Sequence, residues 1–178
     1  MYDDYNGWDT MDFPDEQEFY SDFTDYTVSL KVPPNYVVWG TGTLESPSSV
    51  LQPDALQRFT ASFTSDAIVH VASGADVAAG KVTLQNPVNT WTYTSHEIPD
   101  VAFAVSNHYD WDASSVVVDD ATHRRASVQA AYNDTAADYH HMVGFGRHAL
   151  DWLSHEWPGV PYPYEKSTIV QGSADMEY

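Results

Sequence analysis

The segment YPYEKSTIVQGSADMEY, residues 162–178, is the most informative stretch of this chain. Its apolar run, Ser167 to Val170, is typical of a buried strand, and we expect that strand to cover about residues 166–171. An acidic segment that contains Gly172 follows, and such a segment after a strand often places a carboxylate at the lip of a cleft. The sequence ends just after this strand and this acidic segment, and it shows no further element that could pack against either of them. We therefore expect the chain to be a piece of a longer protein.

Upstream of this strand, apolar residues keep helical spacing between residues 139 and 157. The polar run Asn-Asp-Thr at 133–135 favours a helix N-terminus, and the Pro-Gly pair at 158–159 is a helix terminator. Together these signals predict one long helix over about residues 135–157.

Between residues 25 and 132, short apolar or alternating runs indicate strands. They lie at residues 28–32, 36–44, 67–71, 89–94, 101–105, 116–118 and 126–130. The first two are interpreted as strands joined by a short Pro-Pro-Asn turn. Spaced apolar residues after Pro53 predict one short helix that ends near Phe63. The sequence predicts a mainly β protein, an antiparallel β-sandwich or saddle over residues 1–118, with an α-helical C-terminal part over residues 119–178.

The formal net charge is −19, and 43% of the residues are apolar. That apolar fraction is ample for a packed core. The negative charge disfavours nucleic acid and anionic membranes as partners, because both are bound by clustered Lys and Arg. Cysteine is absent, which excludes disulfides and thiolate metal ligands. No signal peptide is recognisable, so we expect that any export signal precedes the printed sequence.

The predicted long helix carries three histidines at intervals of seven residues, His141, His148 and His155. Such positions are about 10 Å apart along the helix axis. A zinc ion lies about 2 Å from each of its ligands, so it cannot bind two histidines that are this far apart on one helix. Asp151 would give spacings of three and four, but a second helix would have to complete that site. His155 begins a sequence like H-E-x-x-H, with Gly159 at the second histidine position. We predict no metal ligands and no bound cofactor in this chain.

The run SHEWPGVPYPYEKSTIVQGSADMEY, residues 154–178, resembles the aminopeptidase N family of zinc metallopeptidases. It looks most like bacterial members in which the motif G-x-M-E-N reads M-E-Y. Residues 23–44 are similar to late strands of that family's N-terminal β-saddle domain. Residues 97–109 are similar to the strand that leads into its catalytic domain. The resemblance implies a β-saddle followed by the first long helix and strand of a thermolysin-like catalytic domain.

In that family, the Glu of the motif binds the free α-amine of a peptide, and the backbone before it lies along the substrate like an added strand. The resemblance therefore assigns amine binding to Glu177, and the substrate-side edge to Ala174, Asp175 and Met176. Two motif positions differ, since Ala174 replaces the Gly and Tyr178 replaces the Asn. The family's zinc helix follows this motif, so the resemblance implies that the zinc ligands and the catalytic base lie beyond this chain.

We therefore expect a fragment of an exported zinc aminopeptidase that removes N-terminal residues from peptides, with zinc only in the full-length enzyme and no activity in the fragment. For Glu177 taken alone, the plain alternative is a solvated carboxylate. One other hypothesis is a β-sandwich module that binds carbohydrate or protein, with Trp8, Trp91 and Trp111 as stacking residues. Another is a catalytically inactive family member that serves as a scaffold.

Overall fold

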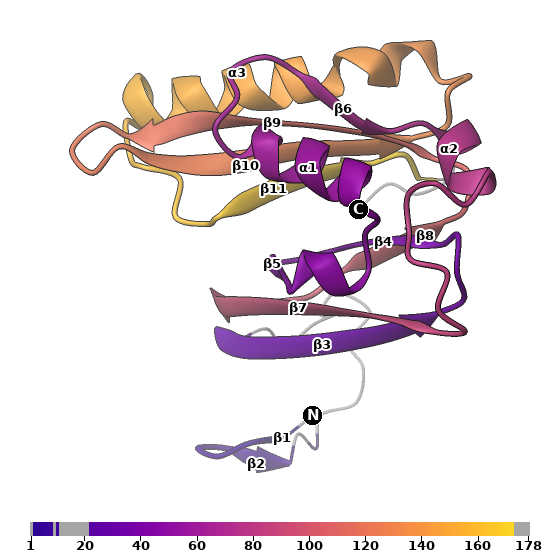
Figure 1. Ribbon diagram of the computed structural model, residues 1–178. Coiled ribbons are helices and arrows are strands. Elements are labelled where there is room, and N and C mark those ends of the chain that lie inside the picture. Colours follow the sequence, from indigo (N-terminus) through magenta and orange to yellow (C-terminus); the bar gives the residue numbers. More distant parts are fainter. Residues whose placement is uncertain (1, 9, 11–21, 173–178) are drawn as a thin grey trace.

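The protein is mainly β, with antiparallel sheets and one long helix near the C-terminus (Figure 1). This is a computed structural model, and it describes residues 2–8, 10 and 22–172. Figure 1 shows two layers of strands with helices on and between them. The small hairpin of β1 (Tyr2–Asp3) and β2 (Gly7–Trp8) precedes both layers in the chain.

The first layer, called the lower layer after its place in Figure 1, contains two small antiparallel sheets. In the larger sheet, β7 (Asn89–Ile98) lies between β3 (Thr24–Val32) and β5 (Thr43–Glu45). In the smaller one, β4 (Val37–Gly40) pairs with β8 (Phe103–Ser106). Along β3, half-buried and exposed residues alternate, as expected for a strand that packs through one face.

The second layer, called the mixed sheet, has the strand order β11-β10-β9-β6. Its strands are β6 (Val69–Ala72), β9 (Asp110–Asp119), β10 (Arg124–Tyr132) and β11 (Lys166–Val170). The β10–β11 pair is parallel and the other two pairs are antiparallel. The chain therefore crosses from β10 to β11 through the long helix α3 (Met142–His155), as a parallel connection requires.

Helices cover both faces of the mixed sheet (Figure 1). Trp111 belongs to one core cluster together with Phe59 of α1 (Pro53–Ser62). Val118 belongs to a second cluster together with Leu150 of α3. Because strand side chains alternate between faces, one strand serves both clusters. The remaining helices are short: η1 (Pro47–Ser49), α2 (Gly74–Ala78) and η2 (Ala137–His141).

Most of the predicted elements are confirmed. The runs at 28–32, 89–94, 101–105, 116–118 and 126–130 lie in or overlap β3, β7, β8, β9 and β10, and the run at 67–71 overlaps β6. The short helix after Pro53 is α1, and the strand expected at about residues 166–171 is β11.

The long helix begins later than the predicted residue 135, since α3 starts at Met142 after the 3₁₀ turn η2. The side chain of Asn133 accepts hydrogen bonds from the backbone N and the hydroxyl of Thr135. This local turn satisfies the donors that a helix N-cap would otherwise take, so the chain turns before the helix starts.

The strands predicted on either side of the Pro-Pro-Asn turn do not pair with each other. β3 pairs with β7, whereas β4 pairs with β8. All four residues of β4 are buried, so this strand packs inside the core and cannot extend the half-exposed edge of β3. Residue 118, where we predicted the end of the first domain, lies within β9.

Candidate functional site

β11 is an edge strand of the mixed sheet, and the predicted substrate-binding residues 174–177 follow it in the sequence. Gln171 fixes the chain just after it. The Gln171 backbone N donates to Ala131 O at 2.9 Å, and its Oε1 accepts from the backbone N of Asn133 at 2.7 Å. The Tyr109 hydroxyl donates to Gln171 O at 3.2 Å. The exit of the strand is therefore held by β10 and by the chain just before β9.

The predicted site residues Ala174, Asp175, Met176 and Glu177 lie outside the described residues. The amine-binding role of Glu177 and the substrate-edge role of the other three residues therefore stay predictions. In the described part of the chain, β11 has a hydrogen-bonded neighbour on one side only, which is β10. An edge of this kind is what an extended peptide needs if it is to add a strand.

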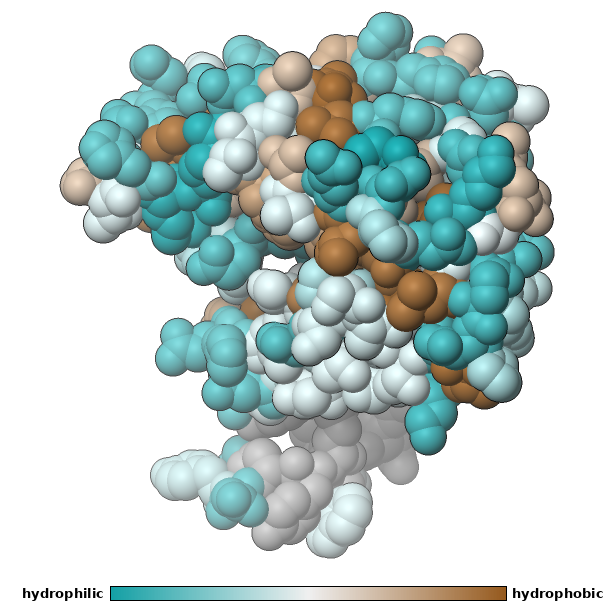
Figure 2. Space-filling view, viewed as in Figure 1, coloured by the Kyte–Doolittle hydropathy of each residue, from teal (hydrophilic) through white to brown (hydrophobic). Residues whose placement is uncertain are grey.

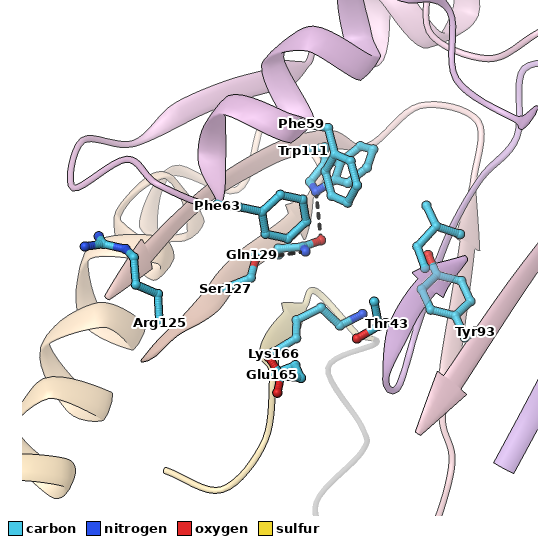
Figure 3. A pocket seen from close by; sticks show the side chains of 11 residues that line it. Thr43, Phe59, Phe63, Tyr93, Trp111, Arg125, Ser127, Gln129, Glu165 and Lys166 are labelled. Atoms are coloured by element: carbon cyan, nitrogen blue, oxygen red, sulfur yellow. Dashed lines mark hydrogen bonds between the residues drawn. The ribbon is translucent and has the colours of Figure 1, made fainter. Parts of the chain in front are cut away.

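A small cavity lies between the mixed sheet and the lower layer, and Figure 3 shows the side chains around it. Its volume is about 170 Å³. Apolar and aromatic side chains form one part of its wall, namely Leu44, Phe59, Phe63, Tyr93 and Trp111, and the charged side chains Arg125, Glu165 and Lys166 also line it. Gln129 supplies a polar patch, since its Oε1 accepts from Trp111 Nε1 at 3.2 Å and its Nε2 donates to Ser127 Oγ at 3.1 Å.

A wider cleft of about 640 Å³ lies beside this cavity, between residues 162–166 and the neighbouring parts of the lower layer. Figure 2 shows the molecule hollowed between the two layers. Acidic side chains of Glu45, Asp100 and Glu165 line the cleft. Lys166 lines both the cleft and the inner cavity, so it links the two spaces.

Lys166 is held by uncharged groups. Its Nζ donates to the carbonyl oxygen of Gly40 in β4 and lies 4.8 Å from the centre of the Tyr93 ring. Among the described residues, no carboxylate forms an ion pair with Lys166, whereas Lys81 pairs with Asp76 at 3.7 Å. Burial lowers the pKa of Lys166 to about 7, because the ammonium form loses its hydration without gaining a counter-charge.

The histidines on the long helix do not converge. His155 contacts Asp151 at 3.2 Å through Nδ1 and Asp120 at 3.6 Å through Nε2. His148 lines an open groove together with Asp151 and His155. Within residues 2–8, 10 and 22–172, no group of three His, Asp or Glu residues is placed to hold a metal ion.

A hydrogen-bonded chain of side chains, which the sequence did not predict, lies at the end of the mixed sheet where β9 begins and β10 ends. His70 Nδ1 lies 2.6 Å from Asp112 Oδ1, and the Tyr132 hydroxyl donates to Asp112 Oδ2 at 2.5 Å. His140 Nδ1 lies 3.3 Å from the same hydroxyl. Burial, with a further effect of Asp112, raises the pKa of Tyr132, so this phenol stays protonated and acts as a donor. Two imidazoles are thus connected through a carboxylate and a phenol, an arrangement that can relay a proton.

The sequence contains one unusual pattern at this hydrogen-bonded chain of side chains. Asp110 and Asp112 alternate with Trp111 at the start of β9, and both carboxylates are buried. The Asp110 side chain accepts from the backbone N of Gly74 at 2.7 Å. A D-x-D pattern inside a strand suggests solvent exposure, but burial is possible here because each carboxylate has hydrogen-bond donors.

Comparison of the chain with models of protein families, with curated proteins and with solved structures finds no match. Within the described residues, none of the helices combines the length and the apolar character that crossing a membrane requires.

Proposed function

We propose that this chain belongs to a zinc aminopeptidase of the aminopeptidase N type, in which Glu177 binds the free α-amine of a peptide substrate. One observation supports this most strongly. The segment that resembles the family forms an edge strand, β11, whose exit is fixed by three hydrogen bonds at Gln171. An edge strand that runs into an amine-binding carboxylate can hold the backbone and the N-terminus of one peptide together.

In this proposal, the lower layer is the late part of a β-saddle, and β10, α3 and β11 begin a thermolysin-like catalytic domain. The parallel β10–β11 pair with α3 packed on it is consistent with an α/β catalytic domain. The substrate is a peptide with a free N-terminus, and nucleic acid and membranes are not partners. Export to the periplasm or the medium belongs to the same proposal.

The described residues do not supply a zinc site, since they contain no suitable group of three ligands. In this proposal, zinc is held by residues outside this set. The part of the reaction that we assign to this chain is binding: Glu177 pairs with the substrate ammonium, and the β11 edge aligns the peptide backbone.

The carbohydrate-binding alternative loses two of its three stacking residues. Trp91 is 0% exposed and Trp111 is 2% exposed, and both pack in the core. Trp8 alone of the three is on the surface. Since stacking on a sugar needs an accessible aromatic face, the structure gives this alternative little support.

The proposal is tested with the protein expressed from its complete reading frame. We expect an H-E-x-x-H sequence beyond Tyr178, followed by a further Glu ligand, and chelator-sensitive release of N-terminal residues from peptides. Peptides with an acetylated N-terminus are the control, and they should be poor substrates. A reading frame without the zinc signature would support the inactive scaffold, and equal cleavage of free and acetylated peptides would contradict amine recognition.

A further inference from the structure

The side chain of Lys166 crosses from the mixed sheet toward the lower layer, and Figure 3 shows its amine pointing toward Thr43. Its contacts are a carbonyl oxygen and an aromatic ring. These contacts orient the amine, and no carboxylate among residues 2–8, 10 and 22–172 forms an ion pair with it. With a pKa near 7, much of this amine is unprotonated at neutral pH, whereas an ordinary lysine is almost entirely protonated. An unprotonated amine has the lone pair needed to attack a carbonyl carbon.

The Lys166 side chain lines open space on two sides. The wider cleft provides a path from solvent, and the inner cavity provides room for an attached group. Three aromatic side chains in the wall of the inner cavity, Phe59, Phe63 and Trp111, favour an apolar occupant. The volume of about 170 Å³ limits that occupant to a small molecule.

The charges around the cleft select the kind of electrophile. Glu45, Asp100 and Glu165 line it, and the whole chain has a net charge of −19. Arg125 lines the inner cavity, but its guanidinium is already paired with Asp66. This negative field repels anions, so the unpaired amine is not a favourable site for a carboxylate or a phosphate. An uncharged electrophile meets no such barrier.

We propose that Lys166 is a covalent binding site for small uncharged aldehydes, with the apolar group of the aldehyde in the inner cavity. The Nζ lone pair forms a C–N bond to the carbonyl carbon and gives a carbinolamine. The carbonyl oxygen then leaves as water with two hydrogens from the amine, and a C=N bond remains. No oxidant or reductant takes part. Once protonated, the imine nitrogen carries a positive charge beside the Tyr93 ring, as the ammonium form of Lys166 does.

The chain has three lysines, which makes the test simple. Lys31 and Lys81 are both exposed and serve as internal controls. The protein is incubated with benzaldehyde at pH 7, and the imine is trapped by cyanoborohydride. Peptide mapping by mass spectrometry then gives the rate at each lysine and separates them from the N-terminal amine. We expect Lys166 to react first, by about tenfold or more, because of its larger unprotonated fraction.

Three comparisons connect this selectivity to the proposed site. Raising the pH to 10 should remove the preference, since the exposed lysines then lose their protons too. Unfolding in urea should make the three lysines equally reactive, because the effect depends on the folded cavity. The anionic probe 4-carboxybenzaldehyde should show a smaller preference for Lys166 than benzaldehyde does.

Variants provide a second measurement. Lys166→Arg keeps the charge but lacks a nucleophilic amine, and it should lose the fastest adduct, whereas Lys31→Arg should keep it. The map of the unmodified sequence is decisive even when the Lys166→Arg variant does not fold. If Lys31 or Lys81 reacts before Lys166 or at the same rate at pH 7, the proposal is wrong.

Discussion

Glu177 is the residue on which the proposed peptidase function depends most directly. In the full-length enzyme, Glu177→Ala would leave the substrate ammonium unpaired at a desolvated site, and losing one partner of such a pair typically costs about 2–5 kcal/mol. The loss should appear in kcat/KM for peptides with a free N-terminus, because the amine also positions the scissile bond. Glu177→Gln should give an intermediate value.

The control for this prediction is a peptide with an acetylated N-terminus, which should be cleaved hardly more slowly by the variant than by the wild type. A solvated Glu177 would instead change kcat/KM by an amount equivalent to about 0.5 kcal/mol or less. Equal losses on both peptides would assign Glu177 a structural role.

Lys166 should also make stability depend on pH. In the folded protein its pKa is about 7, against an ordinary value of 10.5. Between these values the unfolded chain binds the proton and the folded chain does not, so stability rises with pH through this window. Below it, both states are protonated and the folded state carries the full penalty of the buried ammonium.

Lys166→Met lacks this titration. The stability of the wild type relative to this variant should therefore increase from pH 7 to pH 9, by at most about 1.4 kcal/mol per pH unit. Urea unfolding at several pH values measures the difference, with Lys31→Met as the exposed control. Parallel pH profiles for the wild type and Lys166→Met would show that the amine keeps its ordinary pKa.

Asp112 is the central residue of the hydrogen-bonded chain of side chains, because its two oxygens contact His70 and Tyr132. Asp112→Asn replaces one acceptor oxygen by an NH₂ group, which then faces the donor of either His70 or Tyr132. We expect a loss of about 1–3 kcal/mol in the free energy of unfolding, measured with urea. Asp120→Asn is the matched control, because its side chain is 84% exposed, and it should change stability by no more than about 0.5 kcal/mol. If the two substitutions lower the free energy of unfolding equally, the hydrogen bonds of the buried Asp112 carboxylate do not stabilise the fold.

At the scale of single elements, α3 offers a matched pair of glycines. A Cβ at Gly146 would lie 2.8 Å from Val128 Cγ1 on β10, whereas a Cβ at Gly144 would have nothing within 4 Å. Alanine favours a helix over glycine by about 1 kcal/mol at either position. At residue 146, overpacking against the sheet opposes this gain by about 1–3 kcal/mol.

We therefore expect Gly144→Ala to stabilise the protein and Gly146→Ala to be at least about 1 kcal/mol less stable than Gly144→Ala. Thermal or urea unfolding of the two variants side by side measures this difference. A similar gain at both positions would show that α3 does not lie tightly on the mixed sheet.

The same element scale shows what the sequence can predict. The alternation along β3 and β7 depends on one buried face, so a local pattern is sufficient to find those strands. β9 packs through both faces and lacks a simple alternation at its start, and the sequence indicated only residues 116–118. The start of α3 was missed because Asn133 looks like a helix cap but forms a separate turn.

The burial of Lys166 and Asp112 could not be predicted from the local sequence, because their partners are distant in the chain. The acceptor for Lys166 lies on Gly40, 126 residues earlier in the chain. His70 and Asp112, likewise, are 42 residues apart. Charged residues are exposed by default, and what makes them buried is a partner brought in by the fold. The local pattern indicated only that a carboxylate follows the strand, and the amine-binding role of Glu177 came from the resemblance.

At the scale of the whole molecule, we predict that this chain alone does not cleave aminoacyl reporter substrates. Amide hydrolysis of the proposed kind needs a metal-activated water and a general base, and the sequence offers neither within these residues. The assay is release of the reporter by the purified chain, together with elemental analysis for zinc, which should find well below one equivalent. Chelator-sensitive turnover, or stoichiometric zinc that is lost on His148→Ala, would contradict this prediction.

The position of β6 in the mixed sheet has a consequence for how the protein is made. β6 follows β5 in the chain but pairs with β9, which begins only at Asp110. During synthesis, β6 and α1 leave the ribosome before that partner exists, so an unpaired strand edge and the apolar face around Phe59 are exposed for the interval. Such nascent surfaces are prone to association with other chains and are typical chaperone substrates. Efficient production of this protein should therefore depend on chaperone protection until β9 has been synthesised.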